Sequence, residues 1–241
     1  MSASDPSRQL FVFDEIVLSG FFISHPSFYG TSIVRSNFRD ECFVIACGAS
    51  HEGASLAAET GTWSYEHIRK RPYYWEDKRL FMKRIVKTVN LRLFQLQKDP
   101  HYVKEQLRSE FIVVMTSEKK LWAGSVGSGS VWRIRNGEVA NILTSPAALI
   151  PLGTQRKPPN SSFQAETFFP GDMVVLFTAL FEKEGAQQIL SHVFSVHPRS
   201  KEALETAANT LIETLTKSYT EAFGCWILVR VPITRQILHL T

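Results

Sequence analysis

The chain has 241 residues, of which 44% are hydrophobic and 21% are charged, as in an ordinary globular protein. This composition excludes a disordered or fibrous chain, and the length predicts one domain over residues 1–241. The net charge of +4 comes from scattered Lys and Arg, which does not predict a nucleic-acid footprint.

The sequence also indicates where the protein works. No apolar run reaches the roughly 18 residues that a membrane span requires, and the N-terminus lacks the basic start of a signal peptide. The three cysteines include no closely spaced pair, which disfavours a disulfide framework and indicates a reducing compartment. We therefore expect a cytoplasmic protein with no membrane partner.

The first quarter of the chain is predicted to be mostly strand. Residues 9–24 are apolar enough for one or two strands, and residues 28–39 can hold another. Phe43–Cys47 is a short buried strand by its length and content. It runs into the glycine-rich loop Gly48–Gly53, after which we expect the first long helix.

A second helix is predicted over Trp75–Gln97, which has no Gly or Pro and repeats apolar residues every three or four positions. Short strands follow between residues 111 and 143, and we expect them to form one meander. Asn136-Gly137 is typical of a two-residue hairpin turn inside it, because both residues accept positive φ.

The last third of the chain returns to helices. Residues 152–164 are predicted to be loop and Met173–Phe177 a strand, and Cys225–Val231 is the final strand. Helices are expected over 184–194 and 200–219. Long helices between groups of strands predict an α+β fold, in which two antiparallel sheets pack face to face with helices outside, giving four α-β-β-α layers.

Five segments between Gly30 and Val231 resemble, in order, the motifs of the metal-dependent protein phosphatases (PPM-type, or type 2C). FVIACGASHEG at Phe43–Gly53 resembles FAVADGHGG, and RSNFRD at Arg35–Asp40 resembles Arg-x-x-Asn-Glu-Asp. VGSGSVWRI at Val126–Ile134 resembles VGDSRAYLL. PGDMVVLFTALF at Pro170–Phe181 resembles PGDLLLLCSDGL, and GCWILVRV at Gly224–Val231 resembles GDNVTVVVVRV.

The glycines and apolar flanks of these motifs persist, whereas most carboxylates do not. The family binds two Mg²⁺ or Mn²⁺ ions through oxygen ligands to hydrolyse phosphoserine or phosphothreonine. Of its metal-linked aspartates only one persists, and the others are replaced by small or apolar residues. The positions that correspond to the family's metal site are Asp40, Cys47, Gly48, Ser128, Ala179 and Cys225.

The resemblance therefore implies a pseudophosphatase, a PPM-type scaffold without metal or catalytic residues, which regulates a protein partner in signalling. A phosphoprotein or a kinase is the expected partner. Arg35 stands at the family's phosphate-binding arginine, and a guanidinium matches phosphate oxygens.

Three alternatives stay open. An active phosphatase would hold Mg²⁺ or Mn²⁺ through displaced ligands, chosen from Asp40, Glu41, Glu52, Asp172 and Glu182. A zinc site would use Cys47 and Cys225, which the resemblance brings together, with Asp40 and His51; otherwise these cysteines are two buried thiols. A partner-switching regulator of bacterial type is the third.

Overall fold

The structure is a computed structural model of the whole chain. It describes residues 7–13, 16–23, 29–36, 41–70, 77–102, 106–117, 119–144, 150–178, 183–195, 201–218 and 223–230.

The described strands form two antiparallel sheets, as predicted. The six-stranded sheet has the order β1-β2-β11-β10-β7-β8, and the five-stranded sheet has the order β3-β4-β5-β6-β9. The first comprises β1 (Ser7–Phe13), β2 (Ile16–Ile23), β11 (Phe223–Arg230), β10 (Met173–Phe177), β7 (Ser130–Arg135) and β8 (Glu138–Thr144). The second comprises β3 (Tyr29–Ser36), β4 (Glu41–Gly48), β5 (Ser109–Ser117), β6 (Lys120–Val126) and β9 (Ser162–Thr167).

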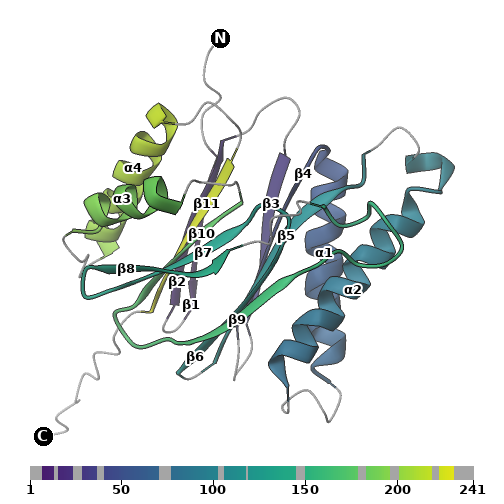
Figure 1. Cartoon of the computed structure of the whole chain (residues 1–241), viewed down its shortest axis with the longest axis horizontal. Coiled ribbons are helices and arrows are strands. Elements are labelled where there is room, and N and C mark those ends of the chain that lie inside the picture. The colour runs from purple at the N-terminus through teal and green to yellow at the C-terminus, as the bar shows by residue number, and fades with distance from the viewer. Residues whose placement is uncertain are drawn as a thin grey trace, which may run out of the picture.

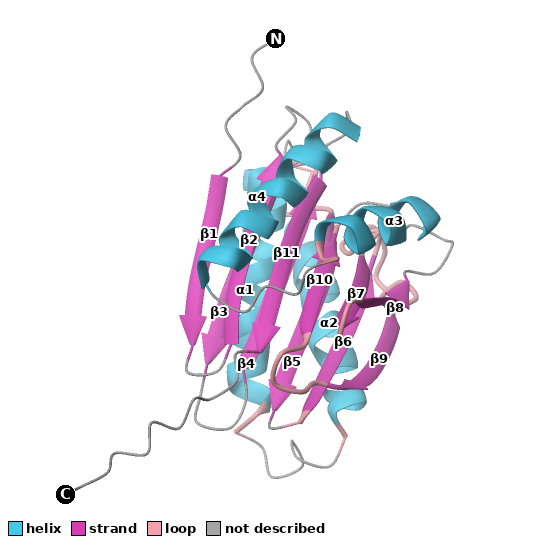
Figure 2. Cartoon of the chain, turned by 90° about the vertical axis from the view of Figure 1, so that its left-hand side faces the viewer, coloured by secondary structure: helices cyan, strands magenta, loops and turns pink. Residues whose placement is uncertain are grey.

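Helices cover the outer face of each sheet, so the molecule has four α-β-β-α layers (Figure 1). Helices α1 (His51–Ile68) and α2 (Lys78–Leu96) lie on the five-stranded sheet, and α3 (Lys183–Val193) and α4 (Lys201–Ser218) cross the six-stranded sheet (Figure 2). A 3-10 turn follows α2 at Pro100–Tyr102. No described helix is long and apolar enough to cross a membrane.

Three hydrophobic clusters correspond to the three interfaces between layers. One joins α3 and α4 to the six-stranded sheet, one joins α1 and α2 to the five-stranded sheet, and the third lies between the sheets. Strand β4 serves two of them, because Cys42, Val44 and Ala46 face the helices while Phe43, Ile45 and Cys47 face the other sheet. Burial on both faces explains its continuous apolar sequence.

The predicted single meander is wrong, because its strands belong to both sheets. Strands β5 and β6 pair in the five-stranded sheet, whereas β7 and β8 pair in the six-stranded sheet. The chain changes sheet at Gly127–Gly129. The Asn136-Gly137 hairpin is confirmed, since both residues have positive φ, of 52° and 81°.

Two further boundaries differ from the prediction. Helix α1 begins inside the expected loop, because Ser50 caps it by accepting a hydrogen bond from the Gly53 N–H at 3.0 Å. Strand β9 begins inside the expected loop 152–164. It is an edge strand paired only with β6 among the described strands, and its side chains are partly exposed, so the sequence lacks an apolar signal there.

Candidate functional site

The site predicted from the glycine-rich motif lies where β4 ends, on the face between the two sheets. Cys47 is the last buried residue of that face on β4. Its register partners are Gly30 on β3 and Glu110 on β5. Glu110 has the same parity along β5 as Ile112 and Val114, which also lie between the sheets. A carboxylate therefore stands beside Cys47 in an otherwise apolar interface.

Four residues meet there, and we call them the Glu110 cluster: Cys47, Glu110, Ser128 and Thr178. Ser128 lies in the turn by which the chain changes sheet, and Thr178 directly follows β10. The Ser128 hydroxyl lies 2.6 Å from the Thr178 carbonyl oxygen and also hydrogen-bonds the Glu110 carboxyl group. The Thr178 side chain bonds the Cys47 thiol. The cluster thus connects both sheets.

The Ser128 hydroxyl has one proton for two neighbours, and this couples it to the charge of Glu110. The Thr178 carbonyl can only accept a hydrogen bond. When Glu110 is protonated, it donates to Ser128 and Ser128 donates to Thr178, so each group is satisfied. When Glu110 is ionised, Ser128 must turn its proton to the carboxylate, and the hydrogen bond from Ser128 to the Thr178 carbonyl is lost.

Burial makes the protonated form of Glu110 accessible near neutral pH. Loss of solvent raises the pKa of Glu110 from 4.5 to about 7, although hydrogen bonds from the side chain and backbone of Ser128 oppose the rise. A carboxyl group with this pKa is not stabilised as an anion by any described cation.

Cys47 is a buried neutral thiol. Burial raises the pKa of Cys47 well above its usual value, a hydrogen bond from Thr178 opposes this, and the nearby Glu110 raises it further. The thiolate is the form that attacks substrates and binds metals. Cys47 therefore lacks the ionisation that a nucleophile needs.

The glycines of the motifs are explained by close packing around this cluster. A Cβ on Gly48 would lie 2.2 Å from the Arg108 carbonyl oxygen, and one on Gly127 would lie 2.6 Å from Cγ of Glu110. Gly127 also has φ of +94°. A Cβ on Gly129 would lie 2.7 Å from Cδ1 of Ile112. The glycine spacing that carries the resemblance is thus a packing requirement.

We expect Gly127→Ala to lower the free energy of unfolding by about 2–4 kcal/mol, because it adds backbone strain and a clash with Glu110. Gly137→Ala is the matched control. Gly137 has φ of +81°, and a Cβ there meets nothing within 4 Å, so it should cost only about 1 kcal/mol. Urea denaturation measures both values, and equal losses would show that packing at Gly127 is unimportant.

The backbone of Arg35 lies toward the opposite end of β4 from this cluster. It pairs with Cys42 on β4, five residues from Cys47, and strands rise about 3.3 Å per residue, which separates the two backbone positions by roughly 16 Å. Asp40 lies outside the described residues. Phosphate binding by Arg35 stays a prediction.

Two other positions are placed only by the backbone. Cys225 on β11 pairs with Phe177, which immediately precedes Thr178, so the backbone of Cys225 reaches the same end of the sandwich as Cys47. Its side chain lies outside the described residues, as does the whole of Ala179.

The described part of the chain contains no set of residues arranged to bind zinc. His51 is exposed at the start of α1, where its ring meets the Tyr29 ring edge-to-face at 6.5 Å. No group of three or more His, Cys, Asp or Glu residues suited to a metal occurs among the described residues.

The proposed displaced ligands are also dispersed. Asp172 is buried and pairs with Arg135 before the first residue of β10, whereas the Glu110 cluster lies after its last residue. Glu52 is in the first turn of α1. Glu182 and the side chain of Glu41 lie outside the described residues.

Glu110 and Thr178 are the residues of the cluster that the sequence analysis did not single out. No family motif includes Glu110, and it directly precedes the apolar strand predicted from Phe111, whereas the observed β5 begins at Ser109. A signal was present nevertheless, since Glu110 alternates with Ile112 and Val114 in a strand buried on both faces. A carboxylate at such a position requires a polar partner, here Ser128.

Comparison with known proteins identifies this fold. No family model matches the sequence, and no curated protein matches it. Solved structures do match. RsbX in complex with magnesium is 14% identical and has a TM-score of 0.59, with 92% of this chain and 98% of that chain covered.

Two serine/threonine phosphatases give similar values. The S. agalactiae enzyme is 12% identical with a TM-score of 0.63, covering 95% of this chain and 99% of that one. The Mycobacterium tuberculosis enzyme PstP/Ppp is 12% identical with a TM-score of 0.59, covering 85% and 98%. The chain has the PPM phosphatase fold. The fold expected from the resemblance is therefore confirmed. At 12–14% sequence identity, these structural matches show a shared fold and do not show a shared activity.

The described residues of this PPM phosphatase fold do not fit a dinuclear Mg²⁺ or Mn²⁺ centre. Such ions require several hard oxygen ligands. The cluster offers one carboxyl group, from Glu110, beside a neutral thiol and two hydroxyl groups, and the β3 residue opposite Cys47 is Gly30. The sole carboxyl group of the cluster is already bonded to Ser128.

Proposed function

We propose that the protein is a pseudophosphatase, which keeps the phosphatase scaffold and regulates a protein partner without hydrolysing phosphate. The observation that carries this proposal is the Glu110 cluster. Where a phosphatase of this fold would concentrate carboxylates around divalent ions, the described residues form a hydrogen-bonded group that connects both sheets.

Paired divalent ions need compensating negative charge, and a buried cation without it is strongly unfavourable. The Glu110 cluster can supply one negative charge at most, and only by breaking the bond from Ser128 to Thr178. A neutral cluster needs neither a buried, uncompensated cation nor the loss of the hydrogen bond from Ser128 to Thr178. Each polar group is satisfied without an ion.

Loss of hydrolysis leaves binding as the function of the scaffold. The expected partner is a protein, with phosphoproteins and kinases as the first candidates, and Mg²⁺ or Mn²⁺ is not required. The alternative of an active serine/threonine phosphatase needs a ligand set that includes residues outside the described part of the chain.

Phosphopeptide hydrolysis tests the proposal. Purified protein is incubated with a phosphothreonine peptide and Mn²⁺, beside the variants Asp40→Ala and Glu110→Gln. We expect no release of phosphate above the buffer control, or a trace equal in all three proteins, which marks a contaminant. Turnover by the unmodified protein that either substitution abolishes would refute the proposal.

A further inference from the structure

Helix α2 is strongly basic along its whole length. It contains six cationic residues and no acidic residue, and the acid at its start is the capping residue Asp77. Several of these cations are neighbours on the helix surface, such as Lys83 and Lys87, four residues apart. Like charges at this spacing destabilise a helix. The six are Lys78, Arg79, Lys83, Arg84, Lys87 and Arg92.

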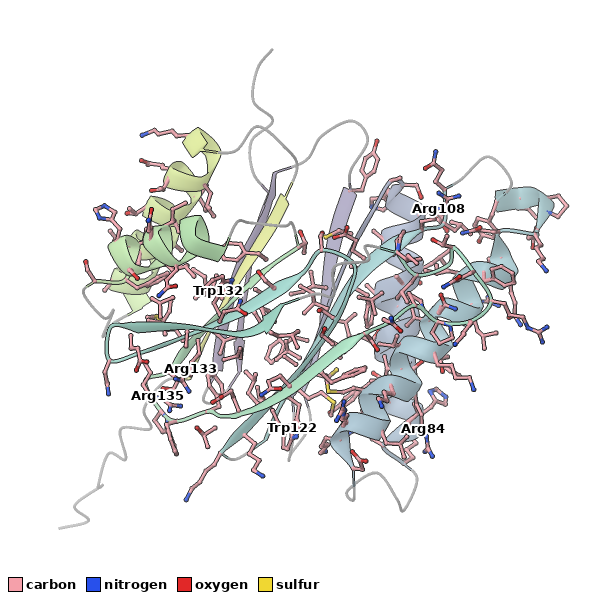
Figure 3. All side chains as sticks on the ribbon, in the orientation of Figure 1. Arg84, Arg108, Trp122, Trp132, Arg133 and Arg135 are labelled. Carbon is pink, nitrogen blue, oxygen red and sulfur yellow. The ribbon has the colours of Figure 1, made fainter. Side chains whose placement is uncertain are left out.

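Three of the cations line a groove between α1 and α2. It has a volume of about 480 Å³. Arg84, Lys87 and Arg92 line it together with the apolar side chains of Ile68 and Leu91. Figure 3 shows Arg84 on α2, in the helical layer outside the five-stranded sheet. The groove therefore combines apolar and cationic surface on the exterior of the molecule.

The order of these residues around α2 is regular. Successive residues of an α-helix are rotated by about 100°, so Lys87 and Arg92 are roughly 140° apart around the helix axis, with Leu91 between them. Along the axis, Arg84 and Arg92 are separated by about 12 Å. An apolar strip is thus flanked by cations over two helical turns.

These cations are available to a partner. Arg84, Lys87 and Arg92 are exposed, and none of them forms an ion pair with another described residue. An anionic partner would relieve the repulsion among them and would meet side chains that already face solvent.

We propose that this groove binds an acidic amphipathic segment of a partner protein. An occupant must place an apolar side chain against Ile68 and Leu91 and carboxylates beside Lys87 and Arg92. A helix with apolar residues at intervals of three and four and acids on either side does both. Nucleic acid fits less well, because no described aromatic ring lines the recess for base stacking.

A membrane surface also fits less well, because peripheral helices insert protruding apolar side chains rather than offer a recess. The groove lies on the outside of the helical layer, apart from the Glu110 cluster between the sheets. The proposal consequently holds whether or not the protein hydrolyses phosphate, and the two tests can fail independently.

Fluorescence anisotropy with a synthetic peptide tests this groove. The probe is a labelled 14-residue peptide with Leu at positions i, i+3, i+4 and i+7 and Glu at most others. Lys87→Glu/Arg92→Glu should weaken binding about fivefold or more, because two attractive contacts become repulsive. Arg79→Glu/Lys83→Glu is the matched control, with the same charge change on the same helix outside the groove, and should weaken binding less than twofold.

Circular dichroism confirms that both variants remain folded. Two further probes, a phosphatidylserine vesicle and a labelled single-stranded oligonucleotide, distinguish the other anionic surfaces. Equal weakening in both variants would show attraction to net charge alone and would overturn the proposal. Failure of the peptide to bind, or groove-dependent binding of the vesicle or oligonucleotide without the peptide, would overturn it as well.

Discussion

Asp172→Ala is expected to lower the free energy of unfolding by about 3 kcal/mol, a decrease in melting temperature of roughly 6–12 °C. The Asp172 side chain is 3% exposed. It accepts hydrogen bonds from Nε and Nη2 of Arg135 at 2.7 and 2.6 Å, and from the Phe169 N–H at 2.7 Å. The substitution leaves these donors without their acceptor. Figure 3 shows Arg135 beside Arg133 on β7.

The neighbouring pair provides the control. Arg133 and Glu166 lie 2.9 Å apart, and the Glu166 side chain is 29% exposed, so Glu166→Ala should cost less than about 1 kcal/mol. Asp172→Asn keeps one acceptor and should fall between the two. Thermal and urea denaturation provide the measurements. An Asp172→Ala protein as stable as the Glu166→Ala protein would contradict the structural role assigned to this aspartate.

Glu110→Gln is expected to change how stability depends on pH. Because the pKa of Glu110 rises from 4.5 to about 7 on folding, the folded state holds this proton more tightly than the unfolded state. The contribution of Glu110 to stability is full below about pH 4.5 and decreases as pH rises to about 7. Glutamine cannot ionise, so at pH 8 the variant should be more stable than the unmodified protein, by up to about 3 kcal/mol.

The difference in the free energy of unfolding between the unmodified protein and Glu110→Gln reports the titration of Glu110, since the two proteins share every other titrating group. Urea denaturation at pH 5, 6, 7 and 8 measures it. Glu59→Gln, on an exposed position of α1, is the control and should give no such trend. A Glu110→Gln difference that stays constant from pH 5 to 8 would show that Glu110 titrates alike in the folded and unfolded chains.

The sequence predicted the elements well where burial patterns are local. Strands β6 and β10 have the predicted bounds, Lys120–Val126 and Met173–Phe177. Their apolar content is decisive because neighbouring layers cover them. The change of sheet at Gly127–Gly129 could not be predicted in this way, since alternation along a strand is the same whichever sheet it joins.

The sequence analysis singled out two of the four residues of the Glu110 cluster. Cys47 and Ser128 were placed by motif order, and both contact Thr178. Arg35 resembles a motif residue, and strand register places its backbone toward the opposite end of β4 from Cys47, while phosphate binding by Arg35 stays a prediction. Register depends on hairpin pairing, which a linear motif does not specify. Glu110 needed the pairing of β4 with β5 to show that it lies beside Cys47.

We propose that hydrogen bonds among Cys47, Glu110, Ser128 and Thr178, rather than divalent ions, hold this end of the sandwich together. Isothermal titration calorimetry with Mn²⁺ near neutral pH tests it most directly. We expect no saturable binding of Mn²⁺ to the unmodified protein. Stoichiometric binding of one or two Mn²⁺ ions per chain, lost in Glu110→Gln, would contradict it.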